Sequence, residues 1–179
     1  MAAHFFFSYI TILLHDFYLI FSFLLILLFN LVFKLNNKIK FPNVLTINYS
    51  YIFISIILIG FLIYNNNYNY QILFNNVLLT STTINILKLI LLMTTLISFL
   101  IIKHFLEINK YYNFEIIIFI FISLIALVFL LSSYDIISIY LTLEIQSLTF
   151  YILAALRKKY IYSIEAGFKY FIIDHFLRH

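Results

Sequence analysis

Apolar residues follow one another along this chain in continuous stretches, without the strict alternation that marks strands of a membrane barrel. A helix needs about 20 mostly apolar residues to cross a bilayer. The expected spans are Phe17–Phe33, Ile47–Tyr64, Thr80–Ile102, Ile116–Leu131 and Ile136–Leu156. The pattern predicts an all-α fold, a polytopic bundle of transmembrane helices that forms a single transmembrane domain over residues 1–179.

The last apolar segment differs from the others. It begins near Ser163 and runs to His179, which is short for a span. Its charged or titratable residues include Glu165, Lys169, Asp174, His175 and Arg178. Such a helix either packs against another polypeptide or ends before it crosses the membrane. We therefore expect about five full spans plus a partial sixth.

Basic residues lie in alternate loops. The loops after the second and fourth spans contain no Lys or Arg. Those after the first, third and fifth contain Lys34, Lys38, Lys40, Lys103, Lys110, Arg157, Lys158 and Lys159. Because Lys and Arg concentrate on the negative side of a membrane, the N-terminus is expected on the opposite side, which in a mitochondrion is the intermembrane-space side.

Composition narrows the class of protein. The chain is 65% hydrophobic and 10% charged, whereas soluble domains carry about 25% charged residues. It has no cysteine, and it lacks a Gly-rich phosphate loop, a dinucleotide fingerprint and a haem or cluster motif. We therefore expect no cofactor, no metal, no nucleic-acid partner and no redox chemistry on this chain. The chain is rich in Phe, Ile, Tyr, Asn and Lys, whose codons are AT-rich. Together with a start without a transit segment, this composition indicates a gene encoded in an organelle.

Glu144 is an isolated acid inside the apolar stretch Ile136–Leu156. A carboxylate near the middle of a span costs about 2.5–3.5 kcal/mol, so intramembrane acids are functional by default. On a helix, Tyr140, Ser147 and Tyr151 share its face. The sequence predicts a polar stripe that faces a hydrated interior, with Glu144 as a proton carrier. The alternative is a structural ion pair or an interhelical hydrogen bond.

Other charged residues have two interpretations each. Glu165 and Lys169 stand at i, i+4 in the favourable order, so they form either a simple salt bridge or a proton relay in which the acid tunes the amine. Lys88, about a third of the way into its span, is either a further relay residue or a lysine that snorkels to the surface. Asp16 and Asp135 are most simply helix caps.

Two motifs resemble a known family. The first reads E-I-Q-S-L-T-F-Y-I-L-A-A from Glu144 to Ala155, and the second reads E-A-G-F-K-Y-F from Glu165 to Phe171. Together they resemble the fifth helix and its continuation in the antiporter-like membrane subunits of respiratory complex I. Within that family they resemble the NADH dehydrogenase subunit 2 branch more than its sister branches.

The resemblance implies roles for four of these residues. Glu144 matches the family's fifth-helix acid, which pairs with a lysine on a later helix to drive proton translocation. Lys169 matches a relay lysine, and Glu165 matches the acid one turn before it. Lys88 stands where the family has a lysine in its third helix. The implied fold is the N-terminal part of an antiporter-like subunit.

The chain departs from the family in extent. The family's proton channel is completed by lysines on broken seventh and twelfth helices, which follow the sixth. Two explanations are open: a split gene, in which a second polypeptide supplies the missing C-terminal helices, or a truncated product.

The function that the resemblance implies is that of a membrane-arm subunit of proton-pumping NADH:ubiquinone oxidoreductase in the mitochondrial inner membrane. The expected partners are other membrane-arm subunits of complex I, the second polypeptide and membrane lipids. One alternative is an antiporter-like subunit of a cation/proton antiporter or of a membrane-bound hydrogenase. Another is a non-catalytic membrane scaffold.

Overall fold

The computed structural model describes residues 14, 16–30, 52, 54–60, 63, 71–73, 77–108, 115–156 and 160–178. Helices dominate the described part. After helical segments at Asp16–Asn30 and at residues 54–60 come α3 (Thr82–Ile108), α4 (Glu115–Ser132), α5 (Ile136–Ala155) and α6 (Ile161–Arg178). The all-α prediction is confirmed, with the addition of a short hairpin made of β1 (Gln71–Leu73) and β2 (Leu78–Thr80).

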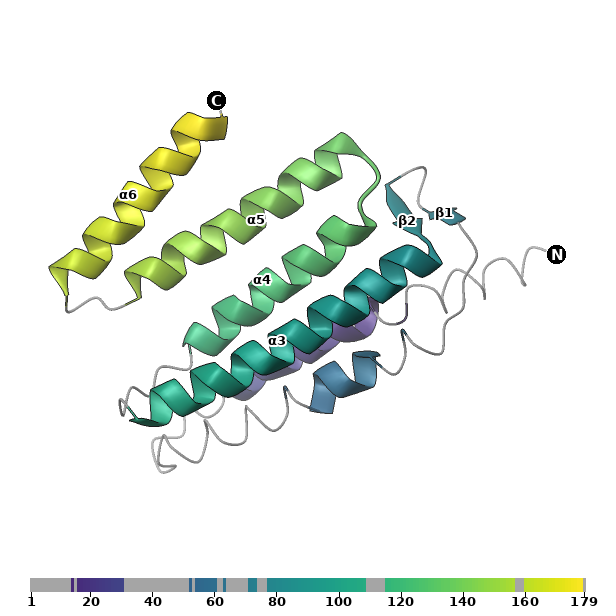
Figure 1. Ribbon diagram of the computed structural model, residues 1–179, viewed down its shortest axis with the longest axis horizontal. Coiled ribbons are helices and arrows are strands. Elements are labelled where there is room, and N and C mark those ends of the chain that lie inside the picture. The colour runs from purple at the N-terminus through teal and green to yellow at the C-terminus, as the bar shows by residue number, and fades with distance from the viewer. Residues whose placement is uncertain are drawn as a thin grey trace.

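Consecutive helices pack side by side from α3 to α6. In Figure 1 they form a row in which α4 lies between α3 and α5, and α6 lies at the far end against α5. The segment Asp16–Asn30 lies behind α3 in this view and reaches α4, because the rings of Phe23 and Phe121 stack with their centroids 6.0 Å apart. The order of the row decides which polar residues can meet.

The core lies at the N-terminal end of this row. It is built from fully buried side chains of both early segments, α3 and α4: Leu19, Ile26, Ile56, Ile59, Leu92, Phe99, Phe121 and Leu124. In α5 the buried residues are the small polar Ser147 and Thr149. The α5–α6 end of the described structure is therefore peripheral and leaves much apolar surface uncovered.

Among the described residues, three helices are long and apolar enough to cross a membrane, and they match the third, fourth and fifth expected spans: Thr82–Leu106, Glu115–Ser132 and Ile136–Ala155. The first expected span appears as the shorter apolar helix Asp16–Asn30. The second falls largely outside the described residues. So do all the basic loop residues used to predict orientation except Lys103.

The hairpin was not predicted. β1 and β2 are antiparallel, with Gln71 opposite Thr80. Thr80, expected to begin the third span, belongs to β2 instead. The helix begins two residues later because the Ser81 hydroxyl accepts a hydrogen bond from the Ile84 N–H at 3.2 Å and so caps α3.

The hairpin also contacts the link between α4 and α5. Leu78 forms an antiparallel bridge with Ser133, and the Tyr134 N–H donates to the Val77 carbonyl at 2.9 Å. Backbone hydrogen bonds therefore join the segment before α3 to the segment before α5.

Candidate functional site

A buried ion pair joins the first helical segment to α3. Lys88 Nζ donates to both carboxylate oxygens of Asp16 at 3.1 Å. The Lys88 side chain is 0% exposed and that of Asp16 is 5% exposed. Removing either charge from such a pair would leave the other one buried and uncompensated, which typically costs about 3–5 kcal/mol.

This geometry overturns one interpretation made from sequence and extends another. Lys88 does not snorkel to the surface, because its ammonium group ends on a buried carboxylate. Asp16 is more than a helix cap, because its carboxylate binds a lysine 72 positions later in the chain. The sequence signal was present but ambiguous: an acid borders the first apolar stretch, and a single lysine interrupts the third.

Glu144 lies in the middle of α5 and is half-buried. Nearer the start of that helix, Asp135 occupies the N-cap position with extended backbone, but its side chain makes no capping hydrogen bond. The prediction that Asp135 occupies the cap position is therefore confirmed, whereas the side-chain hydrogen bond expected of a cap is not formed. Tyr140, expected beside Glu144 in a polar stripe, is 49% exposed, whereas Ser147 is buried.

The hydroxyl groups of α5 are mostly used within the helix. Thr142 donates to the Ser138 and Ile139 carbonyls, Ser147 donates to the Glu144 carbonyl at 3.0 Å, and Thr149 donates to the Gln146 carbonyl. Tyr151 is different, because its hydroxyl donates to a carboxylate oxygen of Asp174 on α6. The predicted stripe therefore continues onto a second helix.

Small residues allow α6 to approach α5 closely. A Cβ added at Gly167 would come within 2.8 Å of the Ala155 Cβ and 3.3 Å of the Tyr151 carbonyl oxygen. The Ser163 hydroxyl donates to the Ala154 carbonyl at 2.7 Å. Close approach at small residues is a common way for membrane helices to pack. It explains why α6 lies against α5 although Gly167 is the only buried residue among those of α6 whose burial is described.

Glu165 and Lys169 form an i, i+4 ion pair with 2.7 Å between Oε1 and Nζ. Their side chains are 50% and 68% exposed. Each is two positions from Gly167, so on a helix with 100° per residue both lie on the side of α6 away from α5. The salt-bridge interpretation is confirmed. The pair is directed toward whatever lies outside α6, and Lys169 is not turned toward Glu144.

The structure therefore separates the predicted site residues into three places. Lys88 pairs with Asp16 on the far side of α4, Glu144 lies on α5, and the pair formed by Glu165 and Lys169 lies on the outer face of α6. Asp174 was not predicted as a site residue. Its position seven residues after Gly167, and so on the same helix face, is the signal that would have found it.

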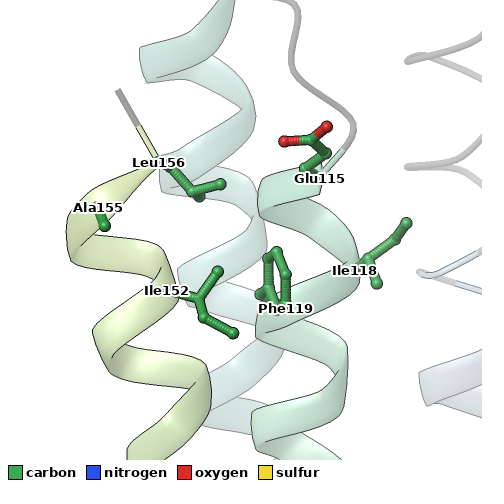
Figure 2. Close-up of a pocket in the computed structure, with 6 residues that line it drawn as sticks. All are labelled: Glu115, Ile118, Phe119, Ile152, Ala155 and Leu156. Atoms are coloured by element: carbon green, nitrogen blue, oxygen red, sulfur yellow. The ribbon is translucent and has the colours of Figure 1, made fainter. Parts of the chain in front are cut away.

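A groove of about 420 Å³ lies between the start of α4 and the end of α5. It is lined by Glu115, Ile118, Phe119, Ile152, Ala155 and Leu156. Figure 2 shows the Glu115 carboxylate at one end of an otherwise apolar surface. Within the described part of the chain, no three His, Cys, Asp or Glu side chains gather as a metal site would require.

Long apolar helices that bury a Lys–Asp pair, with a further acid inside a span, define a polytopic helical membrane protein. Residues 133–176, which include Glu144, the Glu165–Lys169 pair and Asp174, match the family described as NADH:quinone oxidoreductase/Mrp antiporter, TM. This match agrees with the resemblance drawn from the two motifs, which lie within the same segment.

Similarity to individual proteins indicates one branch of this family. NADH-ubiquinone oxidoreductase chain 2 of Oenothera berteroana is 39% identical over 89 residues, which are 50% of this chain and 18% of the relative. Chain 2 of Marchantia polymorpha is 33% identical over 106 residues, which are 59% of this chain and 22% of the relative. NADH-quinone oxidoreductase subunit N of Hydrogenovibrio crunogenus is 30% identical over 119 residues, 66% of this chain and 25% of the relative.

The chain is thus similar to the chain 2 and subunit N branch of the family. The matches span no more than about a quarter of the length of these three relatives.

Proposed function

We propose that this chain is a membrane-arm subunit of proton-pumping NADH:ubiquinone oxidoreductase and contributes part of a proton-translocation path. The observation that supports this most directly is Glu144, a half-buried acid at the middle of an apolar helix, inside the segment that matches the antiporter-like family. Relatives over partial lengths are named as chain 2 or subunit N of the same enzyme class.

In this proposal the chain performs no electron transfer. Redox reactions on other subunits change the electric field along the membrane arm, and Glu144 responds by binding or releasing a proton. The pair formed by Glu165 and Lys169 supplies a base and an acid at the outer face of α6 for exchange with a neighbouring polypeptide. The Asp16–Lys88 pair supplies a separate charged site on α3.

The partners follow from the same proposal. The exposed ion pair on α6 and the exposed apolar surface of α5 are expected to contact other membrane-arm subunits and a second polypeptide that supplies further helices. The apolar groove beside Glu115 fits a lipid acyl chain better than a polar ligand. The proposed location is the mitochondrial inner membrane, with the N-terminus on the intermembrane-space side.

The test is the variant Glu144→Gln in the assembled enzyme, reconstituted into liposomes. We expect the rate of NADH-driven proton translocation to fall by at least about tenfold, because a proton-transferring side chain typically contributes about 10²–10⁴-fold. Proton uptake is followed with a pH-sensitive dye while NADH oxidation is measured in parallel.

Asp135→Asn is the matched control, because it makes the same chemical change at a helix-cap position on the same helix, and asparagine is also a good cap. It is expected to pump normally. Normal pumping in Glu144→Gln would leave the scaffold alternative standing. The family description also includes an Mrp antiporter. Co-purification with cation-antiport activity and without ubiquinone reductase subunits would favour that alternative.

A further inference from the structure

The face of α6 that packs on α5 presents a carboxylate, Asp174. It is half-buried, and the Tyr151 hydroxyl donates a hydrogen bond to it across the helix pair. Neither the two motifs nor the roles implied by the family resemblance include Asp174. This contact links α6 to the helix that contains Glu144.

The register of the two helices sets the depth of Asp174. They are antiparallel, as Figure 1 shows, and Gly167 lies level with the last turn of α5, against Tyr151 and Ala155. Seven further residues of α6 advance about 10.5 Å toward the middle of α5. Asp174 therefore lies further toward the middle of α5 than Gly167 does, where the Tyr151 hydroxyl reaches it.

Tyr151 is held so that its hydroxyl reaches the Asp174 carboxylate. Side chains on a helix lean toward its N-terminus, so the phenol of Tyr151 extends from its own Cα back toward Ser147 and Glu144. Two rings of α6 pack edge-on against it, Tyr170 with centroids 5.1 Å apart and Phe171 with centroids 5.5 Å apart. The position of the hydroxyl is therefore fixed by packing as well as by its bond to Asp174.

Lys169 has the opposite placement. It pairs with Glu165 on the outer side of α6, so it does not serve the space between α5 and α6. Asp174, in contrast, is a titratable side chain on the face of α6 that packs against α5. The charged group of α6 that contacts Tyr151 is therefore a carboxylate, and the Lys169 ammonium group pairs with Glu165 on the other side of α6.

We propose that Asp174 is a second proton-binding carboxylate that works with Glu144, and that Tyr151 is the positioning residue that holds it at the interface of α5 and α6. The proposal rests on the proton-translocating function proposed above. It assigns to Asp174 the partner role on α6 that the resemblance gives to Lys169.

The proposed step transfers one proton from one carboxyl group to the other. The carboxylic acid of Glu144 gives up its proton and becomes a carboxylate, and the carboxylate of Asp174 takes up that proton and becomes a carboxylic acid. The net charge of the two side chains stays at minus one. Tyr151 need not ionise, because its hydroxyl oxygen can accept a hydrogen bond from a protonated neighbour while its O–H group donates to an ionised one.

The decisive variant is Asp174→Asn in the assembled enzyme in liposomes. The amide oxygen still accepts the hydrogen bond from Tyr151, but the side chain can no longer take up a proton. We expect NADH-driven proton translocation to fall by about tenfold or more with unchanged content of assembled enzyme. Asp174→Glu restores a titratable carboxylate and is expected to recover part of the rate.

A positioning role for Tyr151 is tested separately. Tyr151→Phe keeps the ring contacts and removes the hydroxyl, so we expect slower translocation with normal assembly. Tyr170→Phe is the matched control, because it removes a phenol hydroxyl from the neighbouring ring of the same cluster. It is expected to pump normally.

Each possible result of these experiments either supports or overturns the proposal. Normal pumping in Asp174→Asn, when Glu144→Gln is inactive, overturns this proposal and leaves the proposed function intact. Loss of the assembled enzyme in Asp174→Asn also overturns it, because the charge would then be structural although the hydrogen bond was kept. Normal pumping in Glu144→Gln overturns the proposed function itself.

Discussion

At the scale of single residues, the Asp16–Lys88 pair shows how a charge is accommodated within an apolar bundle. Each charge alone would be costly at such burial, and both oxygens of the acid contact the ammonium group. A buried pair of this kind is weak evidence for stability, because apolar replacement of both partners is often neutral or stabilising. Comparing single with double apolar replacements of Asp16 and Lys88 therefore separates a structural role of the pair from a proton-carrying one.

Lys88→Met alone is expected to destabilise the folded chain by about 3–5 kcal/mol, because it leaves Asp16 buried without its counter-charge. The double variant Asp16→Leu with Lys88→Met is expected to recover most of that loss. The measurement is the thermal unfolding midpoint of the purified protein in mild detergent. Equal stability of the single and double variants would show that the two charges do not depend on one another.

At the scale of helices, the ends of α4 and α5 were predictable to within one residue. Both apolar stretches are bounded by polar or charged residues that a helix interior in a membrane excludes. The hairpin could not be predicted, because three-residue strands are too short to show an alternating pattern. The partial sixth helix was expected near Ser163 and begins two residues earlier, at Ile161.

The contact at Gly167 leads to a prediction about the α5–α6 pair. Gly167→Ala brings a methyl group to 2.8 Å from the Ala155 Cβ, and the helix backbone there cannot yield as a flexible side chain would. We expect a destabilisation of about 1–3 kcal/mol, as is usual for overpacking. The measurement is the unfolding midpoint in detergent.

Gly60→Ala is the control, since among the described residues a Cβ there meets only Leu89 Cδ2, at 3.9 Å. That variant is expected to gain about 0.5–1 kcal/mol, as alanine does over glycine within a helix. Adding Ala155→Gly to Gly167→Ala should restore stability. If the double variant stayed as unstable as Gly167→Ala, the close contact would not be the cause.

At the scale of the whole molecule, the sequence predicted the pairing of charges one turn apart on one helix, Glu165 and Lys169, but could not predict pairings between helices. Glu144 was recognisable because it is isolated in an apolar stretch. The partner of Lys88 lies 72 positions away, and the partner of Tyr151 lies 23 positions away across a helical hairpin. Such pairings depend on helix rotation and register, which packing at residues such as Gly167 determines.

The outer face of α6 supports a prediction about assembly. An exposed ion pair on a membrane helix is costly against lipid, so we expect another polypeptide to cover Glu165 and Lys169. The chain has no cysteine, so single cysteines can be placed freely. A photo-cross-linker attached at Ile172→Cys, one turn from Lys169 and 49% exposed, should capture a protein partner in the assembled enzyme.

The control site is Leu124→Cys in α4, where the native side chain is 1% exposed and no partner can reach it. Cross-linked products are identified by mass spectrometry. Cross-links from Ile172→Cys to lipid alone would mean that α6 lies at the boundary of the complex.

The hairpin before α3 has a mechanical consequence. Since the Val77 carbonyl holds the Tyr134 N–H, and Leu78 bridges Ser133, the start of α5 is fastened to the strand that runs directly into α3. A displacement of the start of α5 therefore also acts on the start of α3, about two turns from Lys88. The Asp16–Lys88 pair and Glu144 lie on different helices of the row. The backbone contacts between the hairpin and the start of α5 connect these two helices directly.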